Sequence, residues 1–270
     1  MPGVRIVAVT DWTAAVRVGA RIGHAIEAHD RIGSTNDRAL AALSEPDGEG
    51  RAVLAELQVA GRGRRGRTWE SPPGRNVTVS VALRPRLDAS HAGRLGMAAA
   101  LAVRAACRPY AELAVKWPND LVASDGRKVA GLLLETALRD ERLAHVVIGT
   151  GINVNWPSAE MPPEIAESAT SLLELAGHEV DRVELLHGLL AALEDEVAAL
   201  EHGVSPLDRY RAASWLDGRT VTVSLGDEQL EGRVSGVNEM GSLVLETHAG
   251  RRVLASGEVV RVRDRAAVIA

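Results

Sequence analysis

Residues 52–67 read A-V-L-A-E-L-Q-V-A-G-R-G-R-R-G-R. The apolar start predicts a short strand, and the last seven residues alternate three glycines with four arginines. Glycine lets a backbone approach a ligand closely, and arginine offers a permanent charge on a planar fork that fits carboxylate and phosphate oxygens. The segment predicts a loop that closes over a small molecule with several anionic groups. Taken alone, it also fits a solvated loop or a non-specific nucleic-acid tract.

Lysine is scarce in this chain, since it occurs only at Lys116 and Lys128 among 31 basic residues. The arginine bias is typical of coding composition, yet both lysines lie in one short stretch, in K-W-P-N-D (116–120) and K-V-A-G (128–131). A compact ammonium acts as a point charge in a tight pocket, which a wide guanidinium cannot do. The clustering therefore supports a shared role for the two lysines.

The composition is that of a globular protein of one large domain or two, with 270 residues and a net charge of −5. The acidic balance argues against a dedicated nucleic-acid binder. The single cysteine, Cys107, excludes an intrachain disulfide and is expected to be a buried thiol. No signal-peptide pattern and no apolar run of about 20 residues is present, so we expect a cytoplasmic protein without membrane contact.

Hydrophobic periodicity and turn residues predict an α+β fold. A loose capping box at Ser34 and Asp37 opens the first helix, and Asp125-Gly126 predicts a hairpin. Strands are expected at 24–31, 51–57, 75–84, 113–117, 121–123, 128–135 and 145–155, and helices at 36–44, 88–107, 182–201 and 205–214.

Beyond residue 216 the pattern changes to short alternating strands separated by glycine-containing turns. Five such strands are expected, at 220–225, 230–237, 243–246, 252–254 and 259–262. Regular short strands of this kind predict a small barrel. We therefore expect two domains, 1–216 with an amino-terminal arm at 1–23, and 217–270.

Five motifs in order resemble the biotin–protein ligase family: S-T-N (34–36), Q-V-A-G-R-G-R-R-G-R (58–67), K-W-P-N-D (116–120), K-V-A-G-L-L-L-E (128–135) and G-T-G-I-N-V-N (149–155). The resemblance implies a mixed β-sheet flanked by helices, related to class II synthetases, followed by an SH3-like barrel. It also implies that 1–216 is a catalytic domain. ATP would activate biotin as biotinyl-5′-adenylate, and a lysine of a biotin carboxyl carrier domain would then take the biotinyl group. Mg²⁺ is expected with the ATP.

The resemblance assigns roles to individual residues. Biotin contacts are expected from Ser34, Thr35, Asn36, Gln58, Gly61, Arg62, Gly63, Arg64, Trp69, Lys128 and Gly131. ATP contacts are expected from Arg64, Lys116, Asn119 and Asn153. Catalytic roles are expected for Arg62, Arg64, Lys116, Asp120 and Lys128, with Asp120 either positioning a metal or orienting the acceptor lysine.

Each assignment has a plainer structural alternative. Ser34 could serve only as a helix cap, Gln58 could be an exposed loop amide, and Trp69 could pack in the core. Trp117 has no assigned role in the site and is expected to pack in the core. Asn119 and Asp120 also suit an ordinary Pro-Asn-Asp turn. Arg65 and Arg67 could face solvent.

Alternative functions remain open at this stage. A lipoate or octanoate ligase or transferase shares the catalytic core, but lacks this arginine–glycine loop. A nucleic-acid module using residues 61–67 is opposed by the acidic net charge. Two features depart from the family pattern. Leu57 stands at a pocket position where many relatives carry an aromatic residue. The segment before the catalytic region is short, which predicts no winged-helix domain and no specific DNA binding. Monomer and homodimer are both possible.

Overall fold

The computed structural model describes residues 10–263. Its larger sheet has seven strands in the order β1-β2-β3-β7-β6-β5-β4. All neighbouring strands are antiparallel except the parallel pair β1 and β2, so this is the predicted mixed sheet. The strands are β1 (Ile26–Ile32), β2 (Ala52–Gln58), β3 (Val77–Leu83), β4 (Ala114–Lys116), β5 (Asp120–Val122), β6 (Lys128–Arg139) and β7 (Arg142–Ile152).

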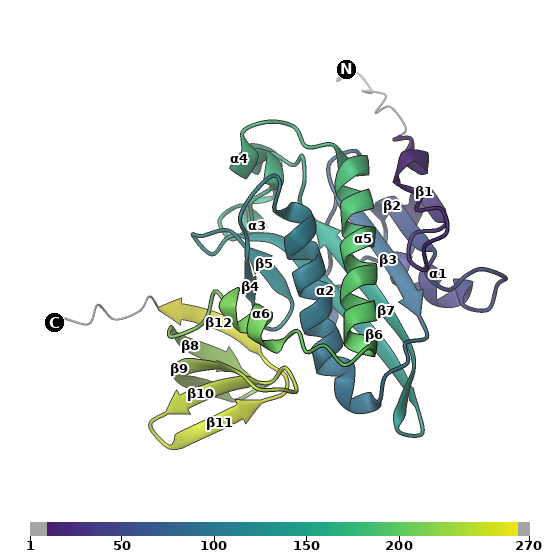
Figure 1. Cartoon of the computed structure of the whole chain (residues 1–270). Coiled ribbons are helices and arrows are strands. Elements are labelled where there is room, and N and C mark those ends of the chain that lie inside the picture. The colour runs from purple at the N-terminus through teal and green to yellow at the C-terminus, as the bar shows by residue number, and fades with distance from the viewer. Residues whose placement is uncertain (1–9, 264–270) are drawn as a thin grey trace.

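Helices flank this sheet (Figure 1). Two long helices, α2 and α5, pack side by side over the main aliphatic core, and α1 packs on β2, β3 and β7 with a small cluster of its own. Because side chains alternate faces along a strand, the same strands serve both layers. The helices are α1 (Thr35–Ala42), α2 (Ala92–Cys107), α3 (Pro163–Ala166), α4 (Leu172–Ala176), α5 (Arg182–Glu201) and α6 (Leu207–Ala212), with 3-10 turns at Trp12–Ala15, Arg64–Gly66, Ala89–His91 and Ser158–Glu160.

Most predicted elements are confirmed within a few residues. The helix at 182–201 has the predicted bounds, and its leucine face is buried. The helix predicted from 88 becomes α-helical only at Ala92, after the 3-10 turn. The strand predicted to reach 155 ends at Ile152, because the Asn153 and Val154 carbonyls accept from Leu172 and Leu173 N–H, at 3.0 and 2.8 Å, at the start of α4.

The predicted capping box at Ser34 is wrong. Ser34 is the N-cap residue of α1, but its side chain makes no capping hydrogen bond. The Gln58 side chain takes part of this role instead, since its Oε1 accepts a hydrogen bond from Thr35 N–H at 2.8 Å. Gln58, on β2, therefore accepts the hydrogen bond from the helix N-terminus that the sequence pattern had assigned to the Ser34 side chain.

The C-terminal segment forms an antiparallel, SH3-like sheet in the order β11-β10-β9-β8-β12. Its strands are β8 (Thr220–Ser224), β9 (Gln229–Val237), β10 (Leu243–Thr247), β11 (Gly250–Leu254) and β12 (Glu258–Arg263). It lies beside the β4 end of the large sheet (Figure 1), and Trp117 Nε1 donates to Gly241 O at 3.0 Å across the junction. The division into domains 1–216 and 217–270 stays a prediction, and residues 1–9 and 264–270 of those ranges lie outside the described residues.

Candidate active site

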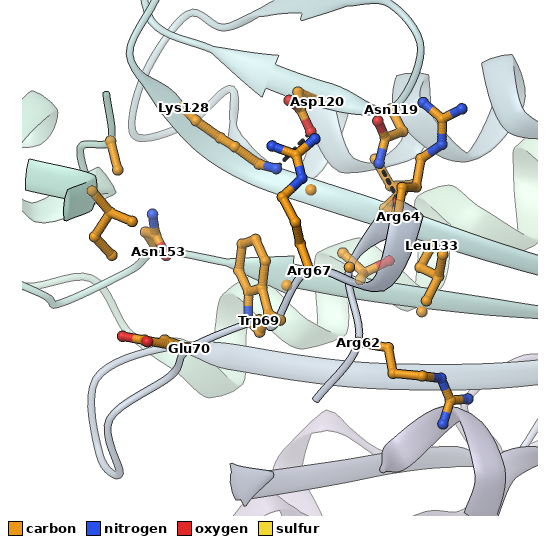
Figure 2. Close-up of a pocket in the computed structure, with 18 of the residues that line it drawn as sticks. Arg62, Arg64, Arg67, Trp69, Glu70, Asn119, Asp120, Lys128, Leu133 and Asn153 are labelled. Carbon is orange, nitrogen blue, oxygen red and sulfur yellow. Dashed lines mark hydrogen bonds and ion pairs between the residues drawn. The ribbon is translucent and has the colours of Figure 1, made fainter. Parts of the chain in front are cut away.

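One cavity of about 490 Å³ gathers nearly all of the predicted site residues. It opens between the glycine–arginine loop, the N-terminus of α1, the turn around Asn119 and the adjoining ends of β6 and β7. Figure 2 shows residues of the loop and of the β5–β6 region facing each other across it. The predicted residues that line it are Ser34, Thr35, Asn36, Gln58, Arg62, Gly63, Arg64, Trp69, Lys116, Asn119, Asp120, Lys128, Gly131 and Asn153.

A chain of short hydrogen bonds lines the α1 end of the cavity. Gln58 Oε1 accepts from both N–H and Oγ1 of Thr35, at 2.8 and 3.0 Å. Ser80 Oγ lies 2.7 Å from Thr35 Oγ1 and 2.6 Å from Asn36 Oδ1, and Asn36 Nδ2 donates to Glu135 at 2.5 Å. Buried polar groups paired in this way hold fixed orientations. This end of the cavity can therefore recognise a neutral, flat group with donors and acceptors.

Glycines on β6 and β7 make room for larger side chains. Gly131 and Gly151 pair across the two strands, and a Cβ atom at Gly151 would lie 2.3 Å from Cε2 of Trp69. A Cβ atom at Gly149 would lie 2.3 Å from Asn36 Oδ1. Because no side chain fills these positions, Trp69 lies directly on the sheet and lines the cavity rather than packing in the core.

The arginine–glycine loop is closed on itself in this structure. Gly63 N–H donates to Arg67 O at 2.6 Å, and Trp69 N–H donates to Gly61 O at 3.1 Å. Gly61 is buried and does not line the cavity, and a Cβ atom there would lie 2.7 Å from the Trp69 carbonyl. Gly61 therefore permits the close approach of the two loop ends. Its predicted contact with ligand has no support in this geometry.

The loop arginines have different partners. Arg62 donates to both Asp37 oxygens at 2.8 and 2.7 Å and also reaches Glu135, so its side chain turns away from the lysines (Figure 2). This hydrogen bonding lowers the pKa of Asp37. Arg64 donates to Gly257 O at 3.3 Å, and burial lowers the pKa of its guanidinium. Arg67, for which a solvent-facing position was the alternative, is exposed and pairs with Glu258 at 2.8 Å at the cavity edge.

The two lysines approach the cavity from β4 and β6, the strands on either side of β5. Lys128 Nζ lies 2.6 Å from Asp120 Oδ1 and 5.4 Å from the centroid of the Trp69 ring (Figure 2). Burial lowers the pKa of Lys116, and the nearby carboxylate of Asp120 partly offsets that effect. A carboxylate thus stands between two ammonium groups and moderates their repulsion.

The two predicted amide contacts are already tied to backbone. Asn119 Nδ2 donates to Leu132 O at 2.6 Å, and Asn153 Nδ2 donates to Thr170 O at 3.1 Å. Both residues line the cavity. Trp117 is buried and packs in the core, as predicted.

Comparison with known proteins agrees with this geometry. Residues 28–153 match the biotin/lipoate A/B protein ligase family, and residues 218–262 match the biotin protein ligase C-terminal domain. The biotin–[acetyl-CoA-carboxylase] ligase of Paracoccus denitrificans is 37% identical over 237 residues, which are 85% of this chain and 97% of that protein. The chain belongs to the biotin protein ligase family.

Other members of the biotin protein ligase family are similar over comparable lengths. The biotin–[acetyl-CoA-carboxylase] ligase of Mycobacterium tuberculosis is 36% identical over 86% of this chain and 87% of its own. The bifunctional ligase/repressor BirA of Bacillus subtilis is 32% identical over 86% of this chain and 72% of its own. The biotin protein ligase of Aquifex aeolicus, solved in complex with biotin and ATP, superimposes with a TM-score of 0.74 at 29% identity, covering 88% of this chain and 98% of that one.

In this member of the biotin protein ligase family, several residues of the site were not predicted from the sequence. Ser80 and Glu135 complete the polar chain, Gly151 supports Trp69, and Glu258 reaches the cavity from β12. The small-residue run G-T-G at 149–151 was a usable signal, because glycine inside a strand marks close approach of other groups. Glu135 ends the motif at 128–135 but was given no role, and no local pattern marks Ser80 or Glu258, since their partners are distant in sequence.

Proposed function

We propose that this protein activates biotin with ATP and transfers the biotinyl group to a lysine of a biotin carboxyl carrier domain. Membership of the biotin protein ligase family supports this activity. The observation that carries it furthest is the shared cavity, which brings the cationic loop, both lysines and the polar chain together.

The head of biotin fits the polar end of the cavity. A ureido ring is neutral and flat, with N–H donors and a carbonyl acceptor, so it needs short polar partners rather than charges. Ser34, Thr35 and Gln58 are the partners we assign to it, held by Ser80 and Asn36. A lipoate or octanoate tail has no such ring, so the paired polar chain supports biotin over these acids.

In the first step, a biotin carboxylate oxygen attacks the α-phosphorus of ATP. A bond forms between that oxygen and phosphorus, the bond to the β,γ-diphosphate breaks, and biotinyl-5′-AMP and diphosphate result. Like charges repel during the approach, by about 4 kcal/mol per unit pair at ~4 Å and an effective dielectric near 20. Lys128 is assigned to the biotin carboxylate, and Lys116 and Arg64 to the phosphates, where fixed cations stabilise the developing charge.

Asp120 has a place in both steps. In the substrate-free protein it pairs with Lys128 at 2.6 Å, and the biotin carboxylate can replace it there. In the second step the carrier lysine, as a neutral amine, attacks the acyl carbon. The bond from that carbon to the AMP oxygen breaks, the C–N amide bond forms, and the nitrogen releases one proton to solvent. We assign Asp120 to orient that amine and accept its hydrogen bond.

Magnesium is expected to enter with ATP. Residues 10–263 contain no group of three or more His, Cys, Asp or Glu side chains arranged to hold a metal ion. Mg²⁺ keeps several waters and commonly binds one or two carboxylates plus substrate phosphates. Single carboxylates at the cavity, such as Asp120 and Glu258, fit that mode.

The nucleic-acid alternative is weaker than the ligase. Arg62 and Arg67 are neutralised by Asp37 and Glu258 rather than presented as an open basic surface. We accordingly expect no specific DNA binding. We also expect a cytoplasmic location and a monomer or homodimer. No helix within residues 10–263 has the length and apolarity to cross a membrane.

Two assays test the function. Purified protein should catalyse biotin-dependent exchange of diphosphate into ATP, and a biotin carboxyl carrier domain should gain the mass of one biotinyl group with biotin and ATP present. Exchange that responds to lipoate or octanoate but not to biotin would discard the assignment.

A further inference from the structure

Lys116 ends the edge strand β4, and the segment that leads into the C-terminal sheet runs beside it. Val115 N–H donates to Ala213 O at 2.8 Å, and Trp215 N–H donates to Val115 O at 2.8 Å. Val115 and Ser214 form a parallel bridge. The backbone of Trp215 is thereby fixed against the residue that precedes Lys116.

The Trp215 side chain is held from two further directions. Nε1 donates to Ser124 O at 3.3 Å, in the turn between β5 and β6. The ring lies against Gly126, where an added Cβ atom would be 2.4 Å from Cζ2. An indole held by backbone pairing, a hydrogen bond and close packing offers a rigid surface to its neighbours.

The Lys116 ammonium lies over this surface, 5.5 Å from the ring centroid. Lys128 has an ion pair with Asp120 at 2.6 Å, whereas no carboxylate in residues 10–263 lies within 4.0 Å of Lys116 Nζ. The face of an indole attracts an ammonium group, more strongly where water is excluded. The ring therefore limits the positions available to the Lys116 side chain without neutralising its charge.

The same indole contacts the C-terminal sheet. Arg219 Cζ lies 4.4 Å from the Trp215 ring centroid, and Arg219 Nε donates to Trp215 O at 2.8 Å. Arg219 O in turn accepts from Val234 N–H of β9 at 2.8 Å. One side chain thus joins the C-terminal sheet to a lysine of the cavity.

The geometry points to Trp215 as a positioning residue for Lys116, holding its ammonium group where the phosphates of ATP enter. Trp215 does not line the cavity, so it acts through Lys116 and not by contact with substrate. The inference rests on the proposed function only in assigning the phosphates to Lys116. The contact between ring and ammonium is testable without any activity.

The first test uses the fact that Lys116 and Lys128 are the only lysines in the chain. Reductive methylation with ¹³C-formaldehyde keeps the positive charge and gives each lysine its own NMR signal, which Lys128→Arg assigns. The ring current of Trp215 should displace the Lys116 signal, and Trp215→Leu should remove that displacement. An unchanged Lys116 signal in Trp215→Leu overturns the inference.

The second test is a double-mutant cycle on ATP affinity, measured by calorimetry. Trp215→Leu should weaken ATP binding about tenfold while biotin affinity changes less than about twofold, and Trp215→Phe should restore most of the loss. In a Lys116→Gln background, Trp215→Leu should have no further effect. An equal loss in both backgrounds would show that Trp215 acts on structure and not through Lys116.

The two tests separate this inference from the proposed function. A wild-type protein without biotin-dependent exchange would contradict the ligase assignment, and the NMR signal would still report the ring–ammonium contact. Exchange activity together with an undisplaced Lys116 signal would retain the ligase and reject the role of Trp215.

Discussion

Trp69 lies on Gly151 so closely that a Cβ atom there would be 2.3 Å from its Cε2. Gly131, the cross-strand partner of Gly151, faces the same indole, and its Cβ position lies 3.1 Å from Cζ3. Two adjacent strands therefore provide a bare backbone surface for one aromatic side chain at the cavity wall.

Gly151→Ala should displace Trp69 and weaken biotin binding by about tenfold or more, since overpacking of this kind typically costs about 1–3 kcal/mol. Gly151 has no positive φ, so alanine suits the strand itself. Calorimetry with biotin measures the effect. Gly96→Ala in α2 is the matched control, because its added Cβ meets the nearest atom only at 4.0 Å. Equal biotin affinity in both variants would remove Trp69 from the site.

Lys128→Ala should weaken biotin binding by about 10- to 100-fold, the usual scale for a lost hydrogen bond to a charged group. ATP affinity should change much less, because Lys116 and Arg64 remain for the phosphates. Separate titrations with biotin and ATP compare the two. Arg139→Ala, at the exposed far end of β6, is the control. A larger loss for ATP than for biotin would reverse the assigned role.

The backbone of residues 61–67 should gain protection from hydrogen exchange when biotin and ATP are added together. In this structure the loop is closed on itself through the Gly63–Arg67 hydrogen bond. Its Arg62 side chain is bound to Asp37 and Glu135 at the cavity rim, and contacts of the loop with both ligands would add to these bonds. Mass spectrometry of the loop peptide measures the exchange. Unchanged exchange would mean that the loop does not respond to ligand.

Lys116→Met should raise the free energy of unfolding at neutral pH while it impairs adenylate formation. Burial lowers the pKa of Lys116 in the folded protein below its usual 10.5, so folding opposes the charged form. As pH rises toward 10.5, the folded wild type releases this proton before the unfolded chain does, and its disadvantage shrinks. Urea unfolding at several pH values tests this. A variant less stable than wild type at pH 7 would contradict it.

Cys107 should be inert to thiol reagents while the protein is folded. It is buried in α2, and desolvation raises the pKa of its thiol to about 12, so almost no thiolate exists at pH 8. Labelling with a chromogenic disulfide should occur only on unfolding, in step with loss of circular dichroism. Rapid labelling of the native protein would place this thiol at the surface.

The predicted elements illustrate what periodicity can and cannot provide. The α5 boundaries followed from leucine spacing alone, because helix amphipathicity is a local property. The cap of α1 could not be predicted in this way. Ser34 lies at the cavity, and the hydrogen bond from Thr35 N–H goes to Gln58, at the end of β2. Local rules assume local partners, and at this site the partners come from across the sheet.

By itself, the sequence determined the chemistry of this protein: the cationic loop, two lysines in a nearly lysine-free chain, and the alternation of elements that carries them. These are properties of side-chain type and short-range spacing. Only the tertiary structure decided which groups meet, placing Glu135 on Asn36 and Trp215 under Lys116. Such pairs depend on the order of strands in the sheet and on where the C-terminal segment crosses its edge, and residues about 100 positions apart leave no local trace of that contact.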